Sequence, residues 1–436
     1  MVLTRFSVPA LLVASLVSPA IAASEGTTFE FSTCGASGRT GPSQTQCNNA
    51  YQGTSLENKV EVVGEGIQEW TVPEDGTYRI TALGSVGEPD KCSNGYSSGR
   101  GAVIQGNFAL EKGETLNIVV GQTDRSGCLS NNDAGGGGSF VAEGKSYSSA
   151  SPLIVAGGGG GAGAQDAGQD AEMATFGGDS VGMPGGTDGG GGEDGVYEYG
   201  KPGAGYVGNA NGNDKNGVSQ HARSFQNGAL GSEAGECSIS NSIGGFGGAG
   251  GGSDCGTAGS GGGGYSGGAA GCDFGDSECP DQDNGGGGGG SFIHAEAENP
   301  ATSDGTWDTT GTEPHPVYTG DPESLDKFNS GPGYVKVKLV QGSGPGFCNF
   351  RGPRNQCVSN QTNFLSQSSF DVSSALLVEP SAVFQSSLSQ PLINVSNSTR
   401  LSGEWRGGFE VSSSSSPVIG AGASLEPGEE DIVIGK

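Results

Sequence analysis

Ten cysteines are the residues of this chain whose number and spacing say most about its chemistry. They are Cys34, Cys47, Cys92, Cys128, Cys237, Cys255, Cys272, Cys279, Cys348 and Cys357. The count is even, no CxxC pair occurs and the chain has only three histidines, so disulfide pairing is a better interpretation than zinc binding. A catalytic thiol is not expected if the cysteines are paired. Disulfides persist outside the cytosol, so the cysteines predict an exported protein.

The N-terminal residues agree with export. Residues 1–22 contain one basic side chain, Arg5, an apolar run and a small-residue cleavage pattern that ends at Ala22. This predicts a secretory signal peptide over residues 1–22. An uncleaved membrane anchor is the alternative, but Pro9 and Pro19 interrupt the apolar run. No other segment approaches the ~18 apolar residues of a membrane helix, so we expect no transmembrane segment in the mature chain.

Acidic side chains outnumber basic ones, and the resulting negative charge limits the kinds of partner to be expected. The chain has 48 Asp and Glu against 20 Lys and Arg, and its formal charge is −28. This charge would repel nucleic acid and anionic lipid, and would attract a basic protein or cations. The alternative is that the charge only keeps a glycine-rich chain in solution.

One stretch combines acids with aromatic side chains. In TDGGGGEDGVYEYG, residues 187–200, the candidate ligand-binding residues are Asp188, Glu193, Asp194, Tyr197, Glu198 and Tyr199. Carboxylates complement a basic partner, and tyrosine suits the centre of a protein interface. The alternative for each residue is a solvated loop.

Signals of catalysis are weak. No HExxH metalloprotease motif occurs, and acids are too abundant for any one pair to indicate general acid and base catalysis. Residues 273–275 spell the DFG motif of protein kinases, but they lie between Cys272 and Cys279, and no VAIK or HRD segment occurs. We take this motif as chance and expect no enzyme activity, no cofactor and no metal site.

Alternating apolar and polar residues predict the elements that position these groups. In residues 66–87 the apolar positions are Trp70, Val72, Tyr78, Ile80 and Ala82, on two sides of a turn at 73–76. In residues 101–122 they are Phe108, Leu110, Leu116, Ile118 and Val120, around a turn at 111–113. Each pattern is typical of a β-hairpin with one buried face. We expect a mostly β fold, with a sandwich over residues 23–156 that is closed by a late strand at 333–340.

Glycine runs interrupt this β pattern. They lie at residues 135–138, 157–161, 189–192, 261–264 and 285–290. A flexible linker is the simplest interpretation, but apolar residues, aromatic residues and cysteines flank the runs and favour packing. Extended helices with three residues per turn can lie side by side where no side chain intervenes, and their backbones then bond laterally. We expect residues 157–290 to form an inserted subdomain of packed polyglycine II helices, and residues 291–340 to return to the sandwich.

The C-terminal part differs in composition from both regions. Residues 341–436 are rich in serine, as at 412–416, and we expect a mostly flexible, disordered tail. Cys348 and Cys357 can close a small loop there. Glycosylation acceptors of the Asn-X-Ser/Thr type occur at Asn360, Asn394 and Asn397.

Six stretches follow one another in an order that is known from a receptor family. They are FSTCGASGRTGPSQTQCNNAYQGTSLENKVEV (31–62), GIQEWTVPEDGTYRITALGSVG (66–87), GNFALEKGETLNIVVGQ (106–122), PLIVAGGGGGAG (152–163), GGFGGAGGGSDCGTAGSGGGGYSGG (244–268) and GYVKVKLV (333–340). Together they resemble the extracellular ligand-binding region of the anaplastic lymphoma kinase and leukocyte tyrosine kinase receptors. The first stretch is the most specific of the six.

The resemblance implies an architecture and a kind of function. Residues 28–340 would form a tumour-necrosis-factor-like jelly roll with the glycine-rich subdomain inserted in it. In that family the region binds small basic cytokines, and binding dimerises the receptor. The present chain lacks the membrane helix and the kinase domain of those receptors, so we do not expect kinase activity.

The resemblance also implies disulfide partners. The implied pairs are Cys34 with Cys47, and Cys237 with Cys255. Cys272 and Cys279 lie in a stretch that we cannot match to the family, and we interpret them as an additional local staple.

Two functions remain open at this point. The first is a secreted or cell-surface, receptor-like module that binds an extracellular, basic protein. The second is a structural protein of a matrix or cell wall, or an adhesive, that uses a glycine-rich scaffold and self-associates or binds polysaccharide or ice. Regularly spaced Thr or Ser along the glycine runs would favour the second function, and they are not seen.

Overall fold

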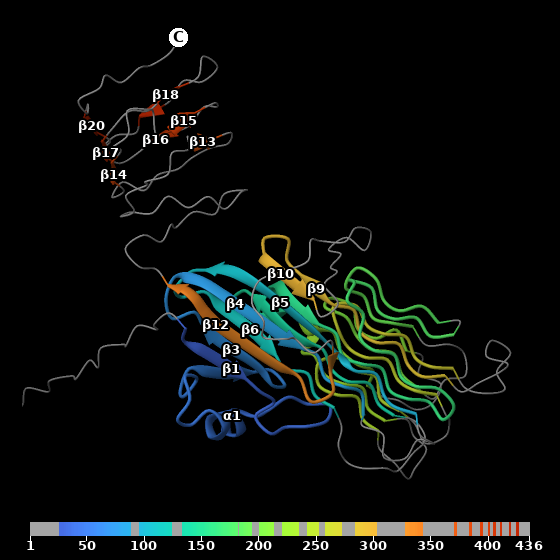
Figure 1. Ribbon diagram of the computed structural model, residues 1–436. Coiled ribbons are helices and arrows are strands. Elements are labelled where there is room, and N and C mark those ends of the chain that lie inside the picture. Colours follow the sequence, from blue (N-terminus) through green and yellow to red (C-terminus); the bar gives the residue numbers. More distant parts are fainter. Residues whose placement is uncertain are drawn as a thin grey trace, which may run out of the picture.

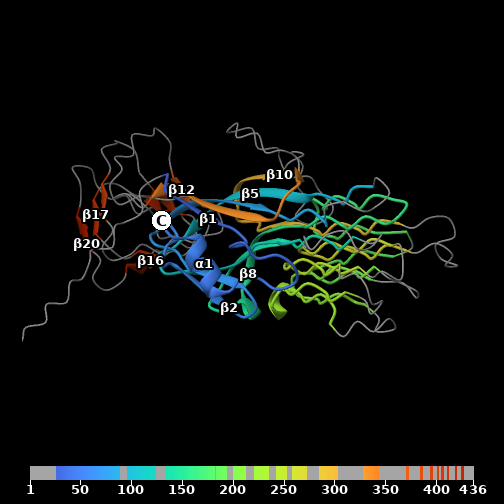
Figure 2. The ribbon, with the colours of Figure 1, turned by 90° about the horizontal axis from the view of Figure 1, so that it is seen from below.

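The computed structural model describes most of the first 342 residues and a few short strands after them. The described residues are 26–88, 96–123, 133–181, 183–193, 200–212, 220–234, 242–252, 258–272, 284–302, 328–342 and the strands between 370 and 426. Two layers of strands form one end of this body, and glycine-rich segments run side by side at the other end (Figure 1). Figure 2 shows the same division from below.

The first layer is an antiparallel sheet in the order β1-β12-β4-β5-β10, with β11 also paired to β5. Its strands are β1 (Thr28–Phe31), β4 (Gly76–Leu83), β5 (Gly101–Leu110), β10 (Glu298–Thr302), β11 (Phe328–Asn329) and β12 (Tyr334–Gly342). The late strand β12 lies between β1 and β4. The predicted closing strand is therefore confirmed.

The second layer is an antiparallel sheet in the order β2-β3-β6-β7-β8-β9. Its strands are β2 (Val60–Val63), β3 (Ile67–Thr71), β6 (Thr115–Val119), β7 (Ser139–Glu143), β8 (Ser151–Ala156) and β9 (Phe292–Ile293). Glycine runs separate β8 from β9 in the sequence, yet the two strands pair. The mostly β, two-sheet fold predicted from the sequence is confirmed.

Both predicted hairpins are wrong in their pairing. β3 pairs with β2 and β6, whereas β4 pairs with β12 and β5, so the turn at 73–76 crosses from one sheet to the other. The turn at 111–113 likewise joins β5 of the first sheet to β6 of the second. Alternation looks the same in both cases, because two strands that face each other across a core bury every second residue just as paired strands do.

Aromatic side chains fill the space between the sheets. Trp70 of β3 is buried, and its ring lies 4.7 Å from Phe29 of β1 and 6.3 Å from Tyr78 of β4, centroid to centroid. The predicted apolar positions of both stretches are buried in this main core. Aromatic contacts of this kind contribute about 0.5–1.5 kcal/mol each beyond the burial of area.

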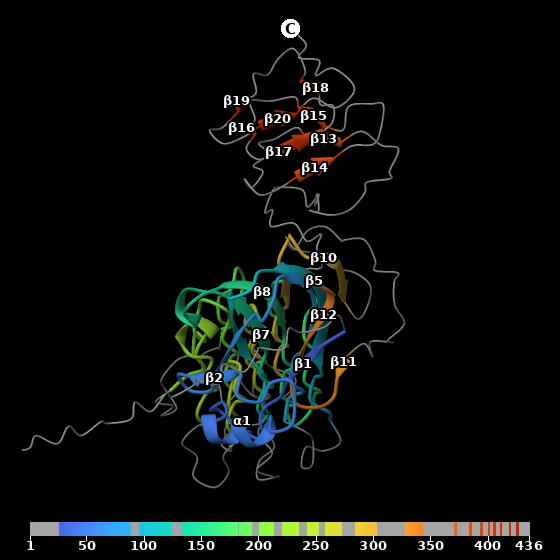
Figure 3. The same cartoon turned by 90° about the vertical axis from the view of Figure 1, so that its left-hand side faces the viewer.

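A short helix protects one open side of the sandwich. Helix α1 (Gln44–Ala50) starts at a capping box of Ser43 and Gln46 and lies beside β2 and β1 (Figure 3). The side-chain amide of Gln44 donates to the carbonyl of Val60 at 3.0 Å and accepts from the amide of Val62 at 2.7 Å. These bonds occupy the free edge of β2, which would otherwise be open to pairing with another chain.

The glycine runs form a packed body, which we call the glycine bundle. Its described segments are 84–88, 96–100, 120–123, 133–138, 157–171, 177–181, 183–193, 200–210, 229–234, 242–252, 258–272 and 284–291. Residues 157–161 are buried, and four of their amides donate to three other stretches of chain, with Gly158 and Gly161, three residues apart, both donating to 258–272. The acceptors are the carbonyls of Gly263, Ser85, Gln169 and Ser260, at 2.8, 3.0, 2.9 and 2.7 Å. Three residues per turn point successive amides in different directions, as a polyglycine II bundle requires, so a flexible linker is excluded here.

Close approach of backbones explains why these residues are glycine. A Cβ added at Gly158 would overlap the carbonyl group of Gly136, and one at Gly99 would overlap the carbonyl group of Gln169. The bundle also contains segments that precede residue 157, such as 84–88 and 133–138. The domain boundaries drawn from the sequence therefore remain a prediction.

The remaining elements are short. Within the described residues, 3₁₀ turns lie at η1 (Tyr147–Ser149) and η3 (Phe225–Asn227). The C-terminal strands pair in parallel among themselves. They are β13 (Phe370–Val372), β14 (Val383–Gln385), β15 (Ile393–Val395), β16 (Arg400–Leu401), β17 (Glu404–Arg406), β18 (Glu410–Val411), β19 (Val418–Ile419) and β20 (Ser424–Glu426). Asn394 lies in β15, whereas Asn360 and Asn397 lie outside the described residues, so flexibility and glycosylation of this part stay predictions.

Candidate interaction surface

A second apolar cluster joins the sandwich to the glycine bundle. Phe140 of β7 and Val155 of β8 point to the outer face of the second sheet, where they pack with Tyr206 and Phe246 from the bundle and with Phe225 of η3. The second sheet is thus buried on both faces. This explains why consecutive residues at the end of β8, just before the glycine run at residue 157, are all apolar, since both faces of a strand covered on two sides are buried.

Aromatic rings form a stack along this junction. Phe225 lies 5.3 Å from Phe140 and 4.9 Å from Tyr206, centroid to centroid, and the planes of Phe225 and Tyr206 differ by 12°. Tyr265 continues the stack at 6.2 Å from Tyr206 and 4.6 Å from Phe292 of β9. The stack runs from buried rings to half-buried ones, because Tyr265 and Phe292 are partly exposed. It holds five separate segments of the molecule in fixed relative positions.

The two tyrosines of the stack are weak acids. Burial raises the pKa of Tyr206, whose hydroxyl donates to the carbonyl of Ala150 at 2.7 Å. Burial also raises the pKa of Tyr265, and the negative charge of Asp188 raises it further. Both hydroxyls therefore stay protonated at neutral pH. Asp188 lies near the outer end of the stack, because the amide of the next residue, Gly189, donates to Ser266 Oγ beside Tyr265 at 3.1 Å.

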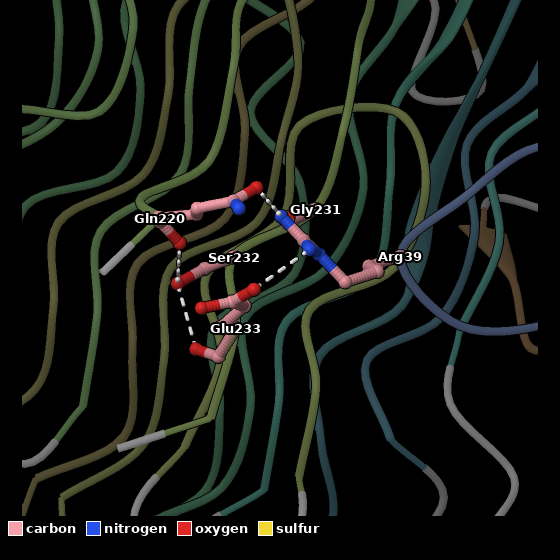
Figure 4. A network of polar contacts seen from close by, with 5 residues as sticks. All are labelled: Arg39, Gln220, Gly231, Ser232 and Glu233. Atoms are coloured by element: carbon pink, nitrogen blue, oxygen red, sulfur yellow. Dashed lines mark hydrogen bonds and ion pairs between the residues drawn. The ribbon is translucent and has the colours of Figure 1, made fainter. Parts of the chain in front are cut away.

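A polar network fixes the N-terminal loop to the bundle (Figure 4). The guanidinium of Arg39 contacts Glu233 at 3.0 Å in an ion pair, and it donates to Gln220 Oε1 at 2.9 Å. Arg39 Nε also donates to the carbonyl of Gly231 at 3.1 Å, and Gly231 donates its amide to the carbonyl of Arg39 at 2.9 Å. A disulfide between Cys34 and Cys47 ties the other side of this loop to α1.

The candidate acids from the sequence are only partly placed. Asp188 is exposed and has a left-handed backbone, with φ of 52°. Glu193 is also exposed, and its backbone bridges to Asn211. Asp194, Tyr197, Glu198 and Tyr199 lie outside the described residues, so a convergent patch of these six side chains remains a prediction.

Two exposed apolar side chains near Asp188 were missed by the sequence analysis. Phe176 is 43% exposed and Val207 is 48% exposed. We call Phe176, Thr187, Asp188 and Val207 together the bundle rim. An isolated apolar residue in glycine-rich sequence carries no periodicity, so only the tertiary arrangement could reveal it.

The cysteines are described in part. The disulfide between Cys34 and Cys47 is the N-terminal pair that the resemblance implies. Cys272 is also disulfide-bonded. The other cysteines lie outside the described residues, namely Cys92, Cys128, Cys237, Cys255, Cys279, Cys348 and Cys357.

Metal-ligand clusters and serine-nucleophile motifs are the remaining candidates for chemistry in the described residues. Among them, no cluster of three or more His, Cys, Asp or Glu side chains is arranged to hold a metal ion. Two GxSxG sequences, centred on Ser97 and Ser266, lie in the glycine bundle and not at a strand-to-helix turn. The hydroxyl of Ser266 is buried and accepts the amide of Gly189 at 3.1 Å, so it is not presented as a nucleophile. Over the same residues, no helix has the length and apolar character to cross a membrane.

Comparison with known proteins shows similarity to a receptor. No protein-family model matches the chain. A segment of 100 residues is 43% identical to the mouse leukocyte tyrosine kinase receptor, over 22% of this chain and 11% of the receptor. The chain thus covers only a small part of the receptor's length. It is similar, over about a fifth of its own residues, to a protein of the kind that the sequence resemblance names.

Proposed function

We propose that this chain is an extracellular, receptor-like binding module that recognises a protein ligand and catalyses no reaction. The observation that carries the proposal is the segment that is 43% identical to the mouse leukocyte tyrosine kinase receptor. The two-sheet fold with its packed glycine bundle supports it, because this is the architecture that the resemblance implies. In this proposal, the sandwich and the bundle together form the binding module.

The charge of the chain indicates the chemistry of the ligand. A formal charge of −28 favours a basic protein, since complementary charge raises the rate of encounter and disfavours acidic partners. The junction supports a binding role as well. The aromatic stack and the Arg39 network hold the bundle rigid against the sandwich, so a ligand would meet a surface that costs little entropy to order.

A structural or adhesive function is the second candidate, and the packed glycine bundle is the observation that favours it. One detail weighs against polysaccharide binding at the aromatic stack. Sugars bind to the open faces of aromatic rings, but Tyr265 and Phe292 lie face to face at 4.6 Å with 15° between their planes. Their faces are therefore largely occupied by each other.

The test is capture of partners by the immobilised chain from residue 23 onward, using the extracellular medium of the cells that produce it. We expect one small basic protein, bound in a defined ratio and released as the salt concentration rises. Recovery of only the chain itself, or of polysaccharide, would overturn the proposal and favour the structural function.

A charge variant makes this test specific. Asp188→Asn with Glu193→Gln should weaken capture, because both acids are exposed on one bundle segment. Glu111→Gln is the matched control. Glu111 is also exposed, but it follows β5 at the end of the sandwich that lies away from the bundle.

A further inference from the structure

We propose that the bundle rim is a docking surface for an amphipathic, cationic segment of a protein partner. The segment would place an apolar side chain between Phe176 and Val207 and a lysine or arginine on Asp188. This inference rests on the proposed function, and it names the place on the chain and the chemistry of the partner.

Backbone bonds bring the rim residues together from three segments. The amide of Gly177 donates to the carbonyl of Gly186 at 2.9 Å, which sets Phe176 beside Thr187. The amide of Val207 donates to the carbonyl of Gly189 at 3.0 Å, which sets Val207 beside Asp188. Thr187 and Asp188 therefore lie between the two backbone segments that carry the exposed side chains of Phe176 and Val207.

The exposure of these side chains needs an explanation. Single apolar residues on a protein surface are ordinary, but neighbouring ones that surround a charge form a pattern found in protein interfaces. Within the described part of the chain, only four large apolar side chains are strongly exposed, and two of them are Phe176 and Val207. The others are Tyr96 and Val181.

The conformation of Asp188 adds a second, independent observation. Its φ of 52° lies in the left-handed region, which an L-residue other than glycine adopts at a cost. The following amides hold it there. Gly189 donates to Ser266 Oγ at 3.1 Å, and Gly190 donates to the carbonyl of Thr187 at 2.8 Å. The carboxylate is thus presented to solvent by a turn that is fixed before any partner arrives.

Charge decides which occupant the rim would take. Two copies of a chain with a formal charge of −28 repel each other, so a second copy is disfavoured at an acidic surface. A cationic segment gains from this same field and from the local carboxylate. A purely polar cation would leave Phe176 and Val207 uncovered, so the partner segment is amphipathic.

The experiment uses defined peptide probes with the mature chain. The probes are a leucine/lysine peptide, a serine/lysine peptide of equal charge and a leucine/glutamate peptide of equal apolar content. Binding is followed by NMR at the amides of Phe176, Asp188 and Val207. We expect only the leucine/lysine peptide to shift these amides in a saturable way. Equal shifts with the serine/lysine peptide, or shifts spread over all acidic surfaces, would overturn the inference.

Variants give the second measurement. Phe176→Ser and Val207→Ser should each weaken the peptide by about tenfold, as for central interface residues. Asp188→Asn should weaken it by about two- to fivefold, and asparagine keeps the left-handed backbone accessible. Val181→Ser is the matched control, because Val181 is 51% exposed but lies outside the rim. Rim variants that bind the probe as the unchanged chain does would contradict the inference.

The same variants separate this inference from the proposed function. If the rim variants capture a basic protein as well as the wild-type chain does, only the inference that the rim is the docking surface is overturned. Failure of the wild-type chain to capture any basic protein would overturn the proposed function itself.

Discussion

The sandwich and the glycine bundle are held together by opposite means. Between the sheets, large side chains such as Trp70 and Tyr78 exclude water, and backbone bonds stay within each sheet. In the bundle, runs of glycine bring backbone against backbone, and amides such as those of Gly158 and Gly161 bond laterally to neighbouring segments. The sandwich is stabilised by the packing of large side chains, whereas the bundle is stabilised by backbone hydrogen bonds that the absence of a Cβ allows.

Energetics explains why the bundle does not stand apart from the sandwich. Ordering a residue costs about 1–2 kcal/mol of backbone entropy, and a hydrogen bond returns about 0.5–1.5 kcal/mol net. These magnitudes nearly cancel, so backbone bonds alone leave a small margin. The apolar junction of Phe140, Tyr206 and Phe225 supplies burial that the glycines cannot. The bundle is thus built against the outer face of the second sheet.

Removal of a large side chain from the sandwich should have the largest effect. Trp70→Ala is expected to lower the free energy of unfolding by about 3–5 kcal/mol, since the indole is buried against Phe29 and Tyr78. Urea unfolding measures this loss. Trp70→Phe is the control and should cost clearly less, because the indole NH has no hydrogen-bond partner to lose. Equal losses for both variants would contradict a volume-filled core.

Addition of one methyl group to the bundle should have the next largest effect. Gly158→Ala is expected to cost about 3 kcal/mol, because the new Cβ would overlap the carbonyl of Gly136 and the backbone must move. Gly331→Ala is the matched control, since its Cβ would meet only Asn329 Oδ1, at 3.5 Å. Thermal unfolding that is equally unchanged in both variants would show that the bundle is not packed backbone to backbone.

Loss of the polar tie between the two regions should cost less. Arg39→Ala is expected to lower stability by about 1–2 kcal/mol, because it removes charge-assisted bonds to Glu233 and Gln220 at a partly exposed site. Limited proteolysis of the loop that carries Arg39 should become faster as well. Gln220→Ala removes only one of these bonds, so its free energy of unfolding should lie between those of wild type and Arg39→Ala. A loss of stability as large as that of Arg39→Ala would contradict separate contributions from the individual bonds.

Neutralisation of one carboxylate at the bundle, that of Glu172, should change the stability least, and the change should depend on pH. Burial raises the pKa of Glu172, and the nearby charges of Asp179 and Asp170 raise it further. A pKa raised by folding means that the folded state holds the proton more tightly. Stability from this group is therefore greatest below its ordinary pKa and is lost as pH rises through the raised value.

Glu172→Gln tests this dependence. The variant should be more stable than wild type at neutral pH, and the difference should vanish below about pH 4.3, the ordinary value for glutamate. Urea unfolding at both pH values measures it. Glu111→Gln, at an exposed position, should stay within about 0.5 kcal/mol of wild type throughout. A variant that is less stable than wild type at neutral pH would contradict the assignment.

Local patterns in the sequence predicted much of the sandwich, but not its connections. Alternation identified the buried faces around Trp70 and Ile118, and it identified β12 as a strand. It could not distinguish a turn within a sheet from a turn between sheets, because both bury every second residue. The doubly covered second sheet also depended on partners, such as Phe225, that lie far away in the sequence.

The candidate surface was less predictable for a related reason. Composition pointed to Asp188 and Glu193 as exposed acids, and both are exposed. Their neighbours depend on how glycine segments are ordered in the bundle, and glycine carries no side-chain pattern that records this order. Phe176 and Val207 therefore became visible beside Asp188 only through the hydrogen bonds between segments.

Amide hydrogen exchange of the glycine runs tests most directly whether the bundle is held by lateral backbone bonds. The amides of Gly158, Gly159, Gly160 and Gly161 donate to three neighbouring stretches of chain, and residues 285–290 are buried beside them. We predict that these amides exchange as slowly as those of β4 and β6 in the sandwich, with protection that reaches the global free energy of unfolding. Exchange at the rate of an unstructured glycine peptide would contradict this account and return the runs to flexible linkers.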